Sequence, residues 1–188
     1  QKINYQNKLQ FIYKTSVVSL YIIFLIKKNI IMSITAYLEI SKGSQIKYEY
    51  NKEKNCLEVD RILHNTNSFP YNYGFIPNTL SPDGDALDII ILCDYPLLAG
   101  SIAKCKIIGG IETRDEKGID DKILAVLDEK LDNKSSYIND IEDINEGSLA
   151  HIIYFLNHYK DNEKNKYVEV GEIYNREKAL NKIKQYTL

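Results

Sequence analysis

The sequence predicts a mainly β fold with helices near its C-terminal end, an α+β protein built as a small barrel or sandwich. Short apolar runs, separated by turn residues, recur between residues 36 and 127. Helical spacing of apolar residues starts only after residue 146. With 188 residues, 44% of them hydrophobic and 27% charged, the chain is long enough for one well-buried domain.

Seven strands and two helices are expected along the chain. The strands are expected at residues 36–40, 46–50, 56–62, 72–77, 86–92, 102–111 and 122–127. Gly109 and Gly110 permit a bend or bulge in the sixth strand. Residues 147–159 place apolar side chains on one helical face, and Tyr174 or Asn175 opens a second helix.

The first 31 residues are excluded from the predicted fold. Residues 16–26 form an apolar run flanked by lysines, which is short for a membrane span and resembles the hydrophobic part of a targeting peptide. The only methionine is Met32. We expect the native product to start there, with residues 1–31 as upstream read-through and residues 32–188 as a single domain. A truncated organellar presequence is the alternative.

Cysteine and charge usage indicate a cytoplasmic protein that gathers cations. Cys56, Cys93 and Cys105 are odd in number and lack paired spacing, so we expect reduced, mostly buried thiols. Residues 1–38 hold five of the 24 basic residues and no acid, which leaves 19 basic against 26 acidic residues in the remainder. That balance disfavours nucleic-acid binding, which normally requires a basic stripe.

The highest local concentration of potential catalytic or metal-binding side chains is an acidic cluster before the fifth expected strand. Asp83, Asp85 and Asp88 fall within six residues, followed by an apolar run at 89–92. Carboxylates so close repel one another unless cations lie between them, which indicates hard divalent ions such as Mg²⁺. A solvated acidic turn is the alternative. An EF-hand calcium loop does not fit, because Leu87 occupies the fifth position.

A second acidic element surrounds Gly118. Asp115 and Asp120 flank this glycine in a segment typical of a tight hairpin turn. By itself the segment reads as an exposed turn. Beside the first cluster it would supply ligands for further metal ions.

Six ordered segments resemble the soluble inorganic pyrophosphatases of the first family, with the bacterial-type enzymes as the nearest pattern. They are Lys47-Tyr48-Glu49, Val59-Asp60-Arg61, Asn72-Tyr73-Gly74, Asp83-Gly84-Asp85-Ala86-Leu87-Asp88, residues 115–122 (DEKGIDDK) and His158-Tyr159-Lys160-Asp161. The resemblance spans about residues 36–183. It implies a small closed OB-like five-stranded β-barrel with two C-terminal helices.

The resemblance also implies an enzyme, an inorganic diphosphatase. Its reaction would be the Mg²⁺-dependent hydrolysis of pyrophosphate to two orthophosphates, by in-line attack of a metal-activated water. Mn²⁺ is expected as a substitute metal. No nucleic-acid partner is expected. A homo-oligomer is expected, with a hexamer favoured over a dimer.

Roles for individual residues follow from the same resemblance. Asp85 is expected to be the general base. Metal binding is expected from Asp83, Asp88, Asp120, Asp115, Glu39 and Glu49. Phosphate binding is expected from Lys47, Arg61, Tyr73, Lys122, Tyr159 and Lys160, of which Lys47, Arg61, Tyr73 and Tyr159 would also assist catalysis. Asp60 and Glu116 are expected to contact these side chains without binding the metal ions or the substrate directly.

Two other classes of protein remain to be distinguished. A non-catalytic barrel that binds nucleic acid would need exposed aromatic residues in a basic groove, whereas the candidate groove here is acidic. A metal-dependent phosphatase or nuclease would need a pocket large enough for a bigger substrate. We expect the convergent lysines, arginine and tyrosines to leave room for two phosphates.

Overall fold

The computed structural model of the chain describes residues 33–188. The expected read-through or targeting segment, residues 1–31, and the expected start at Met32 lie outside the described residues. Among residues 33–188, no helix is long and apolar enough to cross a membrane.

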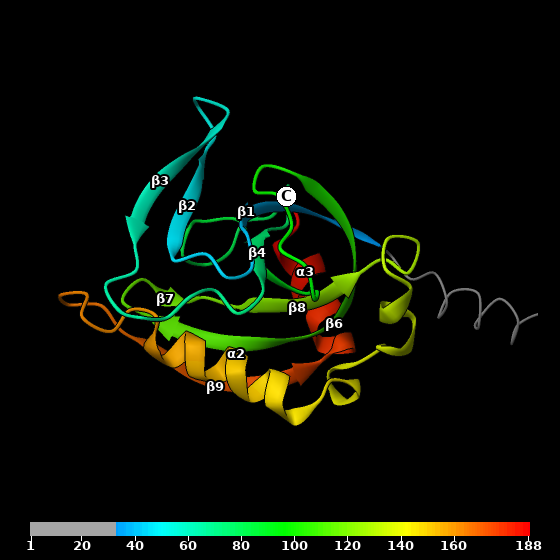
Figure 1. Ribbon diagram of the computed structural model, residues 1–188. Coiled ribbons are helices and arrows are strands. Elements are labelled where there is room, and N and C mark those ends of the chain that lie inside the picture. Colours follow the sequence, from blue (N-terminus) through cyan, green and yellow to red (C-terminus); the bar gives the residue numbers. More distant parts are fainter. Residues whose placement is uncertain (1–32) are drawn as a thin grey trace, which may run out of the picture. The chain divides into compact units, whose positions relative to one another are not determined.

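Five strands close a ring of backbone hydrogen bonds (Figure 1). In spatial order they are β1 (Ile34–Ile40), β4 (Asn72–Phe75), β5 (Asp88–Leu92), β8 (Lys122–Leu127) and β6 (Ile102–Asp115), and β6 pairs back with β1. The β5–β8 pair is parallel and the other four pairs of the ring are antiparallel. The prediction of a mainly β fold with five strands in a closed arrangement is confirmed.

Four further strands extend this ring or stand apart from it. β7 (Gly118–Ile119) and β9 (Val168–Asn175) both pair with β6. β2 (Ile46–Asn51) and β3 (Cys56–Ile62) form a separate hairpin that projects at the top of Figure 1. Neither β7 nor β9 was expected from the sequence. β9 is mostly exposed and interrupted by Gly171, so its pattern is weak, and its pairing depends on a distant strand.

Both predicted helices are present. α2 (Glu146–His158) begins after Asn145, whose side chain accepts a hydrogen bond from the Ser148 N–H. α3 (Arg176–Tyr186) begins after Asn175, which caps the Lys178 N–H in the same way. Two short 3₁₀ turns, η1 (Asn133–Tyr137) and η2 (Ile141–Asp143), precede α2 and were not expected.

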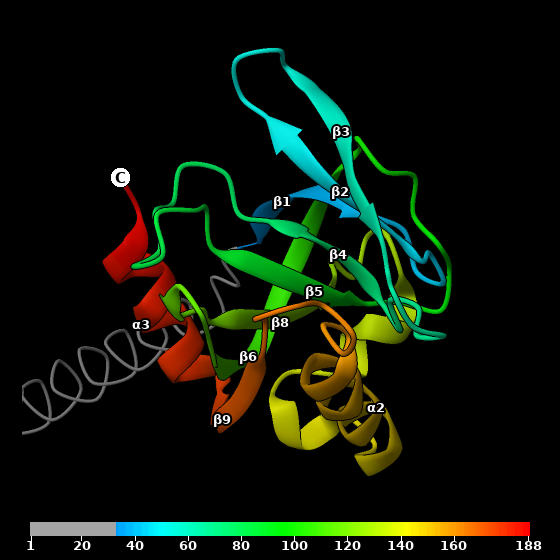
Figure 2. The ribbon, with the colours of Figure 1, turned by 90° about the vertical axis from the view of Figure 1, so that its left-hand side faces the viewer.

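The core lies on both sides of β5 and β8, which explains their uninterrupted apolar runs. Ile89 and Ile91 of β5 pack in the cluster that contains Ile183 of α3. Ile90 packs in the cluster that contains Leu156 of α2. Because successive side chains of a strand point to opposite faces, a strand buried on both faces needs apolar residues throughout. Figure 2 shows α2 and α3 on opposite sides of these strands.

Two finer expectations have different outcomes. The bulge expected at Gly109 is present, because the pairing of β6 with β8 shifts register between Ile107 and Gly109. The expectation of mostly buried, unpaired cysteines holds for Cys93 and Cys105, but Cys56 is exposed. Cys56 is the first residue of β3, close to the exposed turn of the β2–β3 hairpin.

Candidate active site

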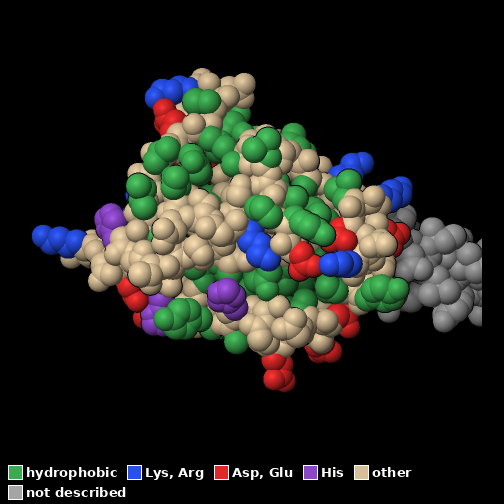
Figure 3. Space-filling view, in the orientation of Figure 1, with side chains coloured by type: hydrophobic (Ala, Val, Ile, Leu, Met, Phe, Trp, Pro, Cys, Tyr) green, Lys and Arg blue, Asp and Glu red, His purple; other side chains and the backbone are tan. Residues whose placement is uncertain are grey.

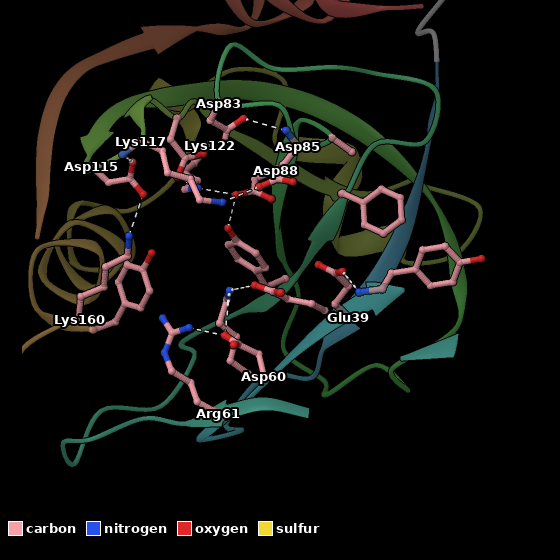
Figure 4. A pocket seen from close by; sticks show the side chains of 18 of the residues that line it. Glu39, Asp60, Arg61, Asp83, Asp85, Asp88, Asp115, Lys117, Lys122 and Lys160 are labelled. Carbon is pink, nitrogen blue, oxygen red and sulfur yellow. Dashed lines mark hydrogen bonds and ion pairs between the residues drawn. The ribbon is translucent and has the colours of Figure 1, made fainter. Parts of the chain in front are cut away.

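A cavity of about 320 Å³ collects the sequence-predicted site residues. All thirteen of them line it: Glu39, Lys47, Glu49, Arg61, Tyr73, Asp83, Asp85, Asp88, Asp115, Asp120, Lys122, Tyr159 and Lys160. Figure 4 shows the labelled side chains pointing into one shared space, with Asp83, Asp85 and Asp88 facing Asp60 and Arg61 across it. Residues more than 100 positions apart in the sequence therefore meet in one pocket.

The first acidic cluster forms a tight turn that leads into β5. The Ser81 N–H donates to the Asp85 carbonyl at 2.7 Å, and the Gly84 N–H donates to the Ser81 carbonyl at 3.0 Å. Gly84 has φ +92°, a backbone conformation that favours glycine. The Asp83 carboxylate accepts the Asp85 N–H at 3.1 Å. This turn fixes Asp83 and Asp85 at the rim, while Asp88 is the first residue of β5.

Lys122 lies between the two acidic clusters. Its ammonium donates to Asp88 and to Asp120, and the Tyr73 hydroxyl also donates to Asp88. Burial alone would lower the pKa of Lys122, but the two carboxylates outweigh burial and raise it, so the side chain stays charged. Burial, together with nearby Asp88, raises the pKa of Asp120 to about 6 despite Lys122. A buried cation at the start of β8 therefore joins Asp88 and Asp120.

The second acidic element is the hairpin that joins β6 to β7. Asp115 pairs with Gly118, whose φ is +128°, and the Asp115 carboxylate accepts the Lys117 N–H at 2.8 Å. Lys160, just after α2, donates to Asp115 at 2.8 Å and lies 3.2 Å from Glu116. Burial opposes ionisation of Asp115, but the Lys160 ammonium and the Lys117 N–H outweigh it and lower the pKa of this carboxyl.

Glu39 is a buried carboxyl at the inner end of the pocket. Its side chain accepts the Tyr50 N–H at 2.8 Å, and the residue is only 9% exposed. Burial raises the pKa of Glu39 to about 7, although the Tyr50 hydrogen bond and Lys47 favour the charged form. A cation placed against Glu39 would therefore favour the ionised form of this carboxyl.

The β2–β3 hairpin supplies the cationic side opposite the acidic turn. Lys47 donates to Glu49 and lies 3.3 Å from Asp60. Arg61 donates from its Nε to Glu163 at 2.7 Å, and its other end contacts Asp60. These pairs hold the guanidinium in the pocket with its orientation fixed.

Three charged neighbours of the candidate site were not predicted from the sequence. Lys117 donates to Asp85 at 3.1 Å, and Glu163 orients Arg61. Lys52 also lines the pocket. Lys117 lies inside a matched segment and could have been found there. Glu163 and Lys52 carry no local signal, because only the fold brings Glu163 to Arg61 and Lys52 to the pocket.

The donor atoms of the pocket fit a hard divalent cation. Nine carboxylates and seven cationic side chains line it. Oxygen-only ligand sets suit Mg²⁺, Mn²⁺ or Ca²⁺ rather than softer metals. Within residues 33–188, no three Asp, Glu, His or Cys side chains form a ready-made ligand group. Lys122 instead lies between the carboxylates of Asp88 and Asp120.

Carboxylates facing lysines and an arginine across a small cavity define a site for phosphate chemistry with metal ions. The chain belongs to the inorganic pyrophosphatase family, whose pattern it matches over residues 36–187. This membership confirms the expected enzyme class, an inorganic diphosphatase.

Individual relatives agree with this assignment. An inorganic pyrophosphatase of Helicobacter pylori strain J99 is 44% identical over 148 residues, covering 79% of this chain and 86% of that protein. An inorganic pyrophosphatase of Nanoarchaeum equitans is 46% identical over 154 residues, which cover 82% of this chain and 95% of that protein.

Solved structures show the same fold. An inorganic pyrophosphatase from Helicobacter pylori superposes with a TM-score of 0.80 at 42% identity, covering 82% of this chain and 91% of that one. An inorganic pyrophosphatase from Thermus thermophilus superposes with a TM-score of 0.76 at 37% identity, and the match covers 80% of this chain and 86% of that one.

Proposed function

We propose that this chain hydrolyses inorganic pyrophosphate to two orthophosphates with Mg²⁺, by in-line attack of water with Asp85 as general base. The observation that supports it most strongly is the convergence of all thirteen expected residues on one cavity of about 320 Å³. Acidic groups and phosphate-binding cations face one another across that cavity, as phosphoryl transfer requires.

The metal-binding side of the proposal rests on oxygen donors alone. Asp83, Asp88, Asp120, Asp115, Glu39 and Glu49 would hold the ions. Bound Mg²⁺ would polarise the phosphate oxygens and lower the pKa of the attacking water. Mn²⁺ is the proposed substitute, since it also accepts oxygen ligands.

The phosphate-binding side rests on cations already held in the pocket. Arg61 presents a planar fork suited to two phosphate oxygens, and Asp60 and Glu163 fix its orientation. Lys47, Lys122 and Lys160 now donate to carboxylates and would share their N–H groups with the substrate. Tyr73 and Tyr159 also line the cavity, and their hydroxyl groups would donate hydrogen bonds to phosphate oxygens.

Asp85 suits the role of base because of its place in the turn. Its backbone is held by Ser81, while its side chain is 67% exposed toward the pocket opening. An ionised carboxylate can only accept protons or hydrogen bonds. It can therefore take the proton released by the attacking water, while Asp83 and Asp88 on either side serve the metal.

A phosphate-release assay distinguishes this function from its two rivals. Malachite-green detection with pyrophosphate, ATP and a nucleic acid in parallel, each with Mg²⁺, should give fast release from pyrophosphate alone. Comparable release from ATP would favour a broader phosphatase. Binding of the nucleic acid without any release would favour the non-catalytic alternative. On the face of the described chain drawn in Figure 3, Lys and Arg side chains are scattered and form no continuous basic stripe, which disfavours nucleic-acid binding there.

The remaining proposals concern assembly and location. We propose a homo-oligomer, a hexamer in preference to a dimer, which light scattering would measure. His151 and His158 lie on α2, a helix with one face toward solvent. A cytoplasmic location is supported by the free cysteines of the described chain.

A further inference from the structure

Asp121 points away from the active site although both its neighbours line it. Asp120 and Lys122 belong to the pocket, whereas the Asp121 side chain is fully buried on the side of α3. Lys182 of α3 donates to its two oxygens at 2.8 and 2.7 Å. The Tyr174 hydroxyl donates to it at 3.0 Å. The second acidic segment is therefore tied to α3 by a buried, fully hydrogen-bonded carboxylate.

The C-terminal end of α3, about one turn beyond Lys182, is tied to the first acidic segment. The Leu80 N–H donates to the Tyr186 carbonyl at 2.8 Å, and the Leu188 N–H donates to the Asn78 carbonyl at 3.0 Å. Thr79 and Thr187 form an antiparallel bridge between these hydrogen bonds. Figure 2 shows the connection from β4 to β5 reaching the C-terminal end of the chain. That connection carries Asp83 and Asp85.

Hydrogen bonds connect the C-terminal tail, Thr187 and Leu188, to Asp88 through Thr79 and Leu87. Thr79 is 3% exposed, and its hydroxyl accepts the Leu87 N–H at 2.9 Å while it donates to the Ile76 carbonyl at 2.6 Å. The Ile76 N–H donates to the Leu87 carbonyl at 2.9 Å, which closes the base of the loop. Leu87 directly precedes Asp88, so a shift of the tail displaces a residue of the pocket.

We propose that α3 with Thr187 and Leu188 is a positioning brace that holds two acidic segments, residues 78–88 and 118–122, in the arrangement that metal binding requires. Asp121 and Lys182 are its positioning residues. Neither lines the pocket, so they act through Asp120, Lys122 and the β4–β5 loop. The inference rests on the proposed function, because those segments carry the proposed base and three of the proposed metal ligands, Asp83, Asp88 and Asp120.

The brace has a clear physical basis. Nine carboxylates and seven cationic side chains line the cavity, so the carboxylates are only partly neutralised by neighbouring cations. Carboxylates that lie this close together favour a more open arrangement unless the loops that carry them are held from outside the cavity. A buried ion pair is sensitive to the loss of one partner, since the other charge then has no compensation. Removing outer contacts of a metal site typically lowers metal affinity by roughly 10–100-fold.

The test uses Lys182→Met in the full chain, with Lys184→Gln on the exposed side of the same helix as the matched control. Hydrogen exchange without metal should become roughly tenfold faster in both segments, with α2 unchanged. Calorimetry should show Mg²⁺ binding at least roughly tenfold weaker. The control should match the wild type, and saturating Mg²⁺ should restore kcat to within about threefold, because the effect lies in positioning.

Unchanged exchange in either segment, or unchanged Mg²⁺ affinity, would overturn the brace. A fall in kcat that saturating Mg²⁺ does not recover would place Lys182 in the chemical step and would also overturn it. If Lys182→Met does not fold, two other variants decide the matter. They are a chain ending at Tyr186, which lacks the tail contacts, and the double variant Asp121→Asn with Lys182→Met, which removes both buried charges.

The exchange measurement needs neither substrate nor metal. A wild-type protein that ignored Mg²⁺ would refute the proposed function, while the exchange comparison would still decide whether α3 holds the two segments.

Discussion

The Lys117 ammonium lies 3.1 Å from the Asp85 carboxylate, so the proposed base is paired with a cation from the β6–β7 hairpin across the pocket opening. Both side chains are largely exposed, at 57% and 67%. Exposed ion pairs contribute little stability and exchange readily. Asp85 can therefore leave Lys117 to accept a proton, and Lys117 can turn toward a phosphate oxygen.

Asp85→Asn should lower kcat by roughly 10²–10⁴-fold with Mg²⁺ binding largely retained, because the amide cannot accept the proton of the attacking water. Steady-state kinetics and Mg²⁺ titration measure the two effects. Asp94→Asn is the matched control, since Asp94 is equally exposed and also pairs with a lysine, at 2.7 Å, outside the pocket. Near-normal turnover in Asp85→Asn at neutral pH would rule out the role of base.

Metal dependence should follow oxygen-ligand chemistry. Asp83, Asp88, Asp115 and Asp120 repel one another and the substrate in the absence of cations, so activity should vanish with chelator. Mg²⁺ should activate and Mn²⁺ should substitute at least partly. Ca²⁺ should bind yet inhibit, because its larger and more flexible ligand shell places the reacting groups less accurately. Full activity in excess EDTA, or equal activity with Ca²⁺, would contradict the metal assignment.

Glu39 should make the metal-free protein less stable as pH rises. Its pKa is about 7 in the folded state against an ordinary 4.5. Folding therefore favours its protonated form, a stabilisation present below pH 4.5 and lost as pH rises through 7. Glu39→Gln keeps an acceptor for the Tyr50 N–H and stays neutral.

The unfolding free energy of Glu39→Gln should therefore rise relative to wild type by about 2.5 kcal/mol between pH 5 and pH 8. Urea titrations in EDTA at the two pH values measure it. Glu53→Gln, at the exposed tip of the β2–β3 hairpin, is the control. Parallel pH profiles for Glu39→Gln and wild type would show that Glu39 is not a strained buried carboxyl.

Gly74→Ala should destabilise the ring by about 3 kcal/mol or more, since overpacking against backbone cannot relax. A Cβ at this position would lie 1.9 Å from the Tyr37 carbonyl oxygen on the neighbouring strand β1. Gly147→Ala in α2 is the comparison, because its Cβ would meet only the Asn145 side chain, at 3.3 Å. Equal thermal stability of the two variants would argue against close packing of β4 on β1.

A chain starting at Met32 should fold and hydrolyse pyrophosphate as well as the full chain. The first described strand starts at Ile34, and the family match starts at residue 36. Circular dichroism and phosphate release would compare the two proteins. Loss of folding in the shortened chain would show that residues 1–31 contribute to the domain.

The sequence by itself determined the ring strands, both helices and thirteen of the residues that line the pocket. Strand β5 is readable because it is buried on both faces, and α2 because its apolar residues follow the helical period. All of the predicted pocket residues except Glu39 lie in one of the six short segments that resemble a known family, and this is how they were found.

Tertiary structure alone decided the rest. β9 forms only because β6 offers it a partner, and Glu163 reaches Arg61 across 102 positions of sequence. Asp120, Asp121 and Lys122 read as one charged run at the connection from β7 to β8, yet Asp120 and Lys122 line the pocket while Asp121 is buried against Lys182. Local patterns report which residues are charged or apolar, whereas the partner of each charge depends on long-range packing that no local pattern records.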